Sequence, residues 1–155
     1  MNVEALRDNL RQPGARVGVG VWIMPRAYFG QESSIAARLD VQFLDIRQAY
    51  LDSLPEGAVF SGLTRTGGYQ NLSNLLRDIT QTTHTRDCLL AHTLDLLLLG
   101  LEVNEREIFW REALEGLPYP RTRLILAVPE NSSEIFPLAI KNQYNAQIAT
   151  GLLSQ

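Results

Sequence analysis

The spacing of apolar and polar positions changes several times along the chain, and each change marks an expected element. Short, nearly continuous apolar runs rich in β-branched residues are typical of strands buried on both faces. Apolar residues at i, i+3, i+4 and i+7 are typical of amphipathic helices. The expected strands are 17–24, 41–46, 88–94 and 124–128. The expected helices are 3–10, 32–39, 47–54, one built on Leu72, Leu75, Leu76 and Ile79, then 105–117 and 135–139.

Several boundaries follow from local residue chemistry. Asn71 or Ser73 is expected near the start of the fourth helix, and Ser132 or Ser133 is expected to cap the last one. Residues 55–68, rich in glycine and threonine, predict a loop with an edge strand. The glycines of the first strand, Gly18 and Gly20, predict a close approach of another backbone.

Strands and helices therefore alternate through most of the chain. Such alternation, with strands this apolar, predicts a mostly parallel sheet with helices on both faces. We expect one α/β domain over 1–155, with three layers and 4–5 strands. Its core is expected at about 16–140, between a short N-terminal helix and a polar C-terminal tail.

Composition narrows the class of protein. Hydrophobic residues make up 45% of the 155 residues, and the net charge is −3, so binding to nucleic acid is expected only indirectly. The single cysteine, Cys88, excludes an intrachain disulfide and is expected to be buried. No apolar run reaches the ~18 residues of a membrane span, and the charged N-terminus does not resemble a signal peptide. We expect a cytoplasmic protein without membrane contact.

Asp95 is the most distinctive candidate. It lies in the largely apolar stretch 87–101, where a buried strand should give way to a loop or helix. In nucleotide-binding α/β proteins, an acid at this place holds Mg²⁺ or orients water beside a phosphate. An acid that caps a helix or lies in the loop at a strand end is the commoner explanation of such a residue. The metal interpretation requires a phosphate-binding loop one or two strands away.

The segment after the first strand, 25–33, is the candidate for that loop. A phosphate-binding loop reads G-x-x-x-x-G-K-[ST], with backbone N–H groups around the phosphates and a lysine on their terminal oxygens. Gly30 matches the second glycine, and Ser33 supplies a nearby hydroxyl. Pro25, Gln31 and Glu32 replace the first glycine, the lysine and the hydroxyl residue. An unrelated strand-to-helix connection explains the segment equally well.

A polar turn, Glu130-Asn131, follows the strand at 124–128. In phosphate-handling ATPases, a polar residue often ends the strand that follows the magnesium-binding one, although a proline-led turn gives the same pattern. The two histidines, His84 and His92, are too dispersed for a zinc site.

The runs FLDIRQAYLDSLP, CLLAHTLDLLLLGL and FWREALEGLPYPRTRLILAVPEN resemble the core of small P-loop, AAA-like ATPases. The similarity is closest to the short P-loop component of bacteriophage-exclusion (BREX) defence systems and covers about 16–140. It implies that Asp95 is the magnesium-linked acid, that Glu130-Asn131 is the sensor turn, and that the phosphate loop falls on 25–32. It further implies Gly30, Gln31, Ser33, Asp95 and Asn131 as nucleotide-site residues.

Because the lysine and the hydroxyl residue are missing, we expect a non-catalytic assembly or regulatory component of a multi-subunit antiviral complex. We expect it to bind protein partners, to be able to self-associate, and to hold no cofactor. Two alternatives remain open. One is a small Mg-ATP-binding protein or NTPase in which a cation such as Arg26 replaces the lysine. The other is a receiver- or flavodoxin-like module built on Asp45 and Asp95.

Overall fold

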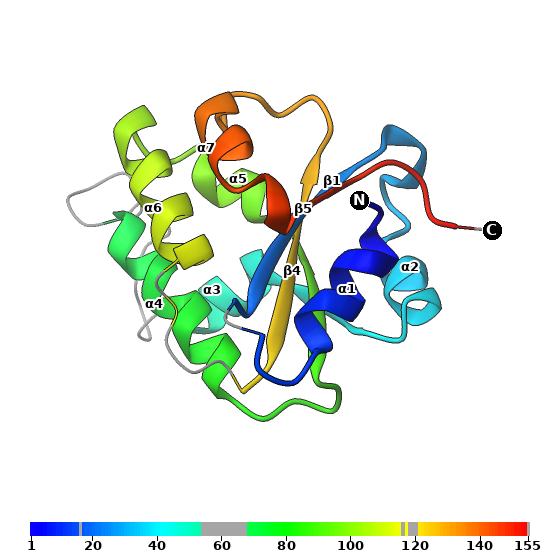
Figure 1. Ribbon diagram of the computed structural model, residues 1–155. Coiled ribbons are helices and arrows are strands. Elements are labelled where there is room, and N and C mark those ends of the chain that lie inside the picture. The colour runs from blue at the N-terminus through cyan, green and yellow to red at the C-terminus, as the bar shows by residue number, and fades with distance from the viewer. Residues whose placement is uncertain (16, 54–67, 116, 118–120, 155) are drawn as a thin grey trace.

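Five parallel strands form one sheet in the computed structural model, and helices cover both of its faces (Figure 1). The structure describes residues 1–15, 17–53, 68–115, 117 and 121–154. The strands are β1 (Val19–Met24), β2 (Gln42–Asp45), β3 (Cys88–His92), β4 (Arg123–Pro129) and β5 (Ile148–Thr150). The α-helices are α1 (Val3–Arg11), α2 (Glu32–Arg38), α3 (Ile46–Ser53), α4 (Gly68–Gln81), α5 (Leu94–Leu98), α6 (Val103–Glu115) and α7 (Leu138–Gln143). The 3-10 helices are η1 (Arg26–Tyr28) and η3 (Asn145–Gln147). The predicted three-layer α/β fold is therefore confirmed.

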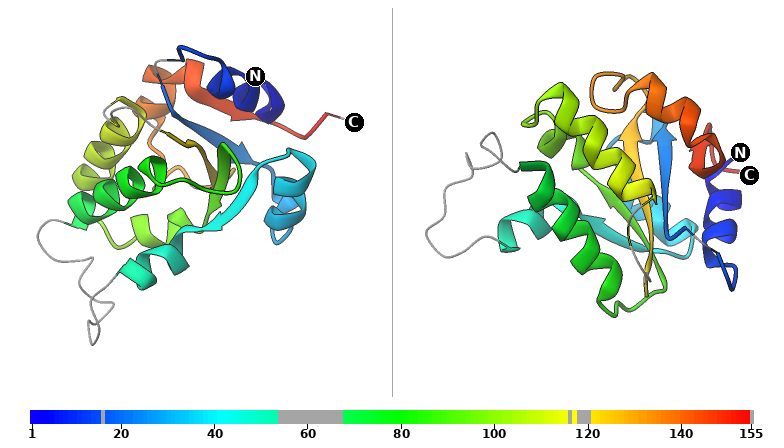
Figure 2. Two further views of the ribbon diagram at one scale, coloured as in Figure 1. Left: turned by 90° about the horizontal axis from the view of Figure 1, so that it is seen from below. Right: turned by 60° about the vertical axis from the view of Figure 1, so that its left-hand side comes forward.

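The strand order is β2-β3-β4-β1-β5, so the chain reverses its direction of travel across the sheet once. From β1 it crosses to the far edge at β2, and from there it moves back strand by strand, finally passing over β1 to reach β5. Crossover connections between parallel strands are right-handed. The outward crossing through α2 and the return crossings through α3 to α7 must therefore lie on opposite faces, as Figures 1 and 2 show.

Alternate side chains of each strand fill the two halves of the core. Val19, Val21 and Leu126 are buried on the face covered by α3 to α7. On the other face, Trp22 and Leu90 are buried beneath α1 and α2. This burial on both faces explains why strands β1, β3 and β4 are apolar nearly throughout rather than alternating.

Cys88 is buried as predicted, at the start of β3. Burial raises the pKa of its thiol to about 12 because the thiolate would be poorly solvated there. The side chain therefore packs as a small apolar group.

Several predicted boundaries are wrong. The helix expected over 135–139 begins only at Leu138, after Pro137. The Ser132 hydroxyl donates to the Pro129 carbonyl instead of capping that helix. Residues 132–136 form a turn, because the ring of Pro137 disfavours the helical conformation at the preceding residue, Phe136.

Helix α4 begins at Gly68, so Asn71 and Ser73 lie inside it rather than at its start. The expected C-terminal tail contains β5, which pairs with β1. The expected loop with an edge strand over 55–68 lies almost entirely outside the described residues. None of the helices in the described ranges combines the length and apolar character needed to cross a bilayer.

The packing of α1 depends on Gly20 in β1. A Cβ atom built at this position would lie 2.6 Å from Cδ1 of Leu6, and Leu6 is only 1% exposed. The predicted close approach at Gly20 is thus made by a side chain of α1 rather than by a backbone. Because Leu6 is enclosed, it has little room to move away from an added methyl group.

We expect Gly20→Ala to lower the free energy of unfolding by roughly 1–3 kcal/mol, because it overpacks this contact. In a Leu6→Ala background the same substitution should cost little, since the methyl group enters the space left by the leucine. Urea unfolding of the single and double variants measures the coupling. Leu10→Ala truncates another buried leucine of α1 and serves as the control background. Equal costs in both backgrounds would contradict the assigned contact.

Candidate functional site at the carboxyl ends of the strands

The three predicted site segments follow three adjacent strands. Strand β4 lies between β1 and β3. The turn that contains Asn131 therefore emerges between the candidate phosphate loop after β1 and Asp95 after β3. All carboxyl ends of a parallel sheet lie at one edge, and the crevice forms where neighbouring connections diverge to opposite faces. Here that divergence occurs between β1, which leads into α2, and β4, which leads into α7.

Asp95 and Asn131 line one hollow. Asp95 is in the first turn of α5 and lines a hollow of about 270 Å³ together with Asn131, Ser132 and Ser133. The Asp95 carboxylate is partly buried. Within the described part of the chain it has no hydrogen bond or ion pair. It is therefore free to accept a cationic group or a donor from a ligand.

A metal at Asp95 would need ligands from elsewhere. Among the residues that the structure describes, no group of three or more His, Cys, Asp and Glu side chains could hold a metal ion. Mg²⁺ commonly binds through one or two carboxylates, water and substrate phosphates. Magnesium binding at Asp95 remains a prediction that depends on a bound phosphate ligand.

The candidate phosphate loop is a compact turn whose N–H groups face its own chain. The N–H of Arg26 donates to the Glu130 carboxylate at 2.9 Å. The N–H of Gly30 donates to the Glu32 carboxylate at 3.2 Å. In a phosphate-binding loop, groups at such positions point at the ligand. Here two carboxylates of the chain accept from them.

The remaining loop contacts follow the same pattern. The N–H groups of Tyr28, Phe29 and Gln31 each donate to the carbonyl three residues earlier, forming the turns of η1 and its end. Gly30 has φ +82°, a turn conformation that glycine adopts without strain. The Gln31 side-chain amide donates to the Ala27 carbonyl, and Ser33 is exposed on the first turn of α2. Gly30, Gln31 and Ser33 therefore lie together in sequence but do not line the hollow beside Asp95.

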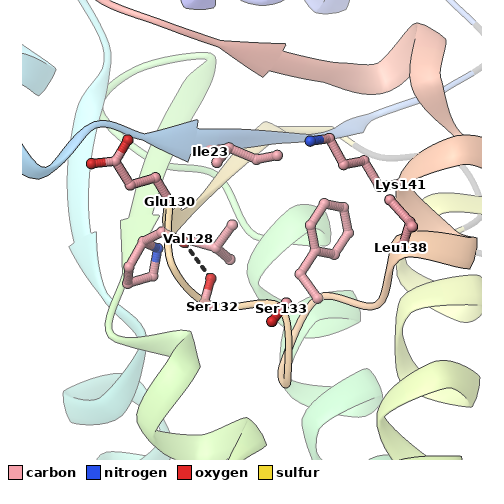
Figure 3. A pocket seen from close by; sticks show the side chains of 9 residues that line it. Ile23, Val128, Glu130, Ser132, Ser133, Leu138 and Lys141 are labelled. Carbon is pink, nitrogen blue, oxygen red and sulfur yellow. Dashed lines mark hydrogen bonds between the residues drawn. The ribbon is translucent and has the colours of Figure 1, made fainter.

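A second, smaller hollow lies at the divergence of β1 and β4 (Figure 3). Its volume is about 130 Å³, and Ile23, Val128 and Phe136 form its apolar lining. Lys141, the only lysine of the chain, lies at its rim, and the Glu130 side chain points away from the lysine. Sites for drug-sized ligands have volumes of about 300–1,000 Å³, so this hollow is small for a nucleotide.

Helix α6 fixes the loop between these two hollows. The Trp110 indole N–H donates to the Ile135 carbonyl at 2.6 Å. The Arg106 guanidinium donates to the carbonyls of Leu98, Leu99 and Glu134. It thereby joins the end of α5, the start of α6 and the loop after β4. These hydrogen bonds connect the elements at the carboxyl edge of the sheet, so its loops are not independent of one another.

A further polar cluster lies at the ends of β2 and β3. The sequence pattern did not predict that its residues lie together. The register pairs Asp45 with His92, and the Thr93 hydroxyl lies 2.6 Å from Oδ1 of Asp45. Thr93 has φ +65°, a left-handed conformation that is strained for a β-branched residue. The N–H of Gln48 donates to Asp45 at 3.2 Å, and that of Arg47 donates to Thr93 at 3.2 Å. These contacts cap α3, and the strand ends where Thr93 adopts its turn.

The pKa of Asp45 is lowered below its ordinary value of 3.8. Burial acts in the opposite direction and is the largest single influence, but hydrogen bonds from Thr93 and Gln48, together with the nearby His92 ring, outweigh it. Nε2 of His92 lies 4.0 Å from Oδ2 of Asp45 and is buried without a hydrogen-bond partner. The cluster has a structural task, because it fixes the start of α3.

A scan against protein-family models finds no matching family, and searches of curated proteins and of solved structures find no matching protein.

We expect Asp45→Ala to lower the free energy of unfolding by about 1–2 kcal/mol at neutral pH, because α3 loses its N-terminal acceptor. Asp52→Ala, which removes only a surface acceptor of Gln48, is the control and should change little.

Comparison with Asp45→Asn tests the charge. Since the folded-state pKa of Asp45 is lowered, ionisation stabilises the fold above the unfolded-state pKa and ceases to do so as the pH falls through the folded-state value. The wild-type advantage should therefore be present at neutral pH and disappear below about pH 4. Denaturation at several pH values measures it. An advantage that grew with acidity would contradict the assignment.

Proposed function

We propose that this protein is a non-catalytic, P-loop-like α/β domain that serves as an assembly or regulatory component of a multi-subunit complex. The resemblance stated above suggests a prokaryotic antiviral defence complex of the bacteriophage-exclusion type. In this role the domain presents the carboxyl edge of its sheet to protein partners and does not turn over nucleotide.

The observation that carries the proposal is the occupation of the candidate phosphate loop by carboxylates. Glu130 and Glu32 accept the N–H groups of Arg26 and Gly30. Two unit charges about 4 Å apart interact by about 4 kcal/mol at the effective dielectric near a protein surface. A triphosphate placed at this loop would meet that repulsion without a lysine to offset it. About 4 kcal/mol corresponds to nearly three orders of magnitude in affinity.

The order of the strands supports the P-loop-like part of the proposal. The strand that leads to the candidate loop, the strand that leads to the polar turn and the strand that leads to Asp95 lie next to one another. Magnesium binding at Asp95 requires a phosphate-binding loop one or two strands away, and β3 lies two strands from β1. The flavodoxin order 2-1-3-4-5 differs, so the receiver-like alternative gains no support from the sheet.

One observation favours the alternative of a nucleotide-binding protein. Arg26 is exposed in the candidate loop, and its guanidinium has no partner among the described residues. A guanidinium binds phosphate through bidentate contacts. This version requires the carboxylates of Glu130 and Glu32 to move away when nucleotide binds.

Titration of ATP with Mg²⁺, followed by calorimetry and by phosphate release, decides between the two. We expect neither saturable binding at micromolar concentrations nor turnover. Micromolar affinity with turnover that is abolished by Asp95→Asn and reduced by Arg26→Ala would refute the proposal. Glu112→Gln, an exposed carboxylate on α6, is the control for a general effect of charge.

A further inference from the structure

Among the described residues, four large apolar side chains are exposed on the part of the carboxyl edge formed by α5 with its C-cap residue, α6 and α7. Leu96 is 49% exposed, Leu99 53%, Val103 70% and Leu138 67%. They come from α5, α6 and α7, and we refer to them together as the α5–α7 face. Single exposed leucines are common, but several on neighbouring elements are characteristic of an interaction surface.

Contacts within the fold place these side chains near one another. Leu99 lines the hollow beside Asp95, and Leu138 lines the smaller hollow at β1 and β4. The two hollows share Pro129, Ser132 and Ser133, so Leu99 and Leu138 lie on the two sides of one loop. Leu96 lies in α5, three residues before Leu99, which is the C-cap residue of that helix. Val103 is one turn before Arg106, whose guanidinium donates to the carbonyls of Leu98 and Leu99.

This face is ordered before any partner binds. Arg106 joins α5, α6 and the loop at Glu134, and the Trp110 indole N–H holds the same loop at Ile135. The Trp110 ring also packs against Phe136, with ring centroids 4.7 Å apart. A surface fixed in this way loses little conformational entropy on binding.

The charges around the face are mainly negative. Among the described residues, four carboxylates near it have neither a side-chain hydrogen bond nor an ion pair: Asp95, Glu102, Glu105 and Glu134. Within the described ranges, the cations on the same side are Arg106, which is bound to three carbonyls, and Lys141 at the rim of the smaller hollow. Arg26 lies beyond Glu130, on the β1 side of that hollow. An apolar face surrounded by carboxylates attracts apolar and basic groups and repels nucleic acid and anionic membranes.

We infer that the α5–α7 face binds an amphipathic helix of a partner protein, with leucine-like side chains on Leu96, Leu99, Val103 and Leu138 and with arginine or lysine beside Asp95 and Glu134. Binding of an amphipathic helix through its apolar stripe is an established mode of recognition. The inference deepens the proposed assembly role and rests on it.

A second copy of the chain is a poorer occupant. Two copies meeting face to face would bring the same four carboxylates together, since a two-fold contact pairs each patch with itself. The other large exposed apolar side chains of the described residues each belong to a different part of the chain: Met1, Phe29, Leu51, Ile108 and Leu152. Met1, Phe29 and Leu152 are brought toward one another, because the Thr150 N–H donates to the Met1 carbonyl and the Leu153 N–H donates to the Tyr28 hydroxyl. A head-to-tail contact through that region is therefore an outcome that sedimentation distinguishes.

Fluorescence anisotropy with synthetic peptides tests the inference. The probe is a labelled helix of about four turns, with leucine at i, i+3, i+4 and i+7 and arginine on its flanks. One control peptide replaces arginine with glutamate, and another has the same composition with scattered leucines. We expect saturable, micromolar binding of the first peptide only, weakened by added salt.

Variants locate the binding. Leu99→Asn and Leu138→Asn should each weaken it at least about tenfold, the effect of a hot-spot residue, whereas Leu152→Asn, which alters an equally exposed leucine, should leave it unchanged. Asp95→Asn with Glu134→Gln should reduce both the affinity and the salt dependence, whereas Glu112→Gln should not. Circular dichroism confirms that each variant is folded.

Three results would overturn the inference. The first is no saturable binding at concentrations up to about 100 μM, at which even a weak complex forms. The second is binding of the peptide to the Leu99→Asn and Leu138→Asn variants as tightly as to the wild-type protein, and the third is sedimentation showing a dimer that Leu99→Asn dissociates. The ATP titration on the same samples keeps the two proposals distinct. If neither the peptide nor the nucleotide binds, the inferred docking site is wrong and the non-catalytic assignment still holds. Nucleotide turnover removes that assignment whatever the peptide does.

Discussion

The handedness of crossover connections is the constraint on which the rest of this structure depends. Because the connections are right-handed, the step from β1 to β2 and the return steps that follow must use opposite faces of the sheet. Neighbouring strands β1 and β4 consequently send their chains apart, and a crevice forms at their carboxyl ends. The hydrogen bond from the Arg26 N–H to Glu130 spans that divergence at 2.9 Å. The chain thus places its own carboxylate at the crevice where open α/β sheets bind their ligands.

The sequence was sufficient for the elements whose apolar pattern is long or continuous. Strands β1, β3 and β4 and helices α1, α4 and α6 were predicted within a few residues. Strand β5 was missed because only three residues pair with β1. It is held by contacts far away in sequence, such as the Thr150 N–H to the Met1 carbonyl. The helix at 135–139 was predicted wrongly because Pro137 and the burial of Ile135 and Phe136 outweigh the local capping pattern.

The candidate site was predictable only in part, because several of its contacts join residues that are far apart in sequence. An acid at the end of an apolar strand and a polar turn after the next strand can be recognised locally, and Asp95 and Asn131 do line one hollow. The acceptors of the loop N–H groups could not be predicted. Glu130 is 104 residues from Arg26, and no local pattern indicates that its carboxylate binds there. The cluster of Asp45, His92 and Thr93 likewise requires the register of β2 on β3.

The carboxyl edge of the sheet therefore has two parts with different polar groups. Near β1, N–H groups that would favour an anion are already bonded to carboxylates. Near α5 and α7, carboxylates without partners adjoin exposed leucines. A triphosphate would have to displace the first set and approach the second, which opposes it electrostatically. A basic, apolar protein segment encounters neither obstacle, because the carboxylates attract its cations and its apolar side chains cover the leucines. The distribution of charge along this one edge, rather than the fold itself, thus supports the proposal of a protein ligand in place of a nucleotide.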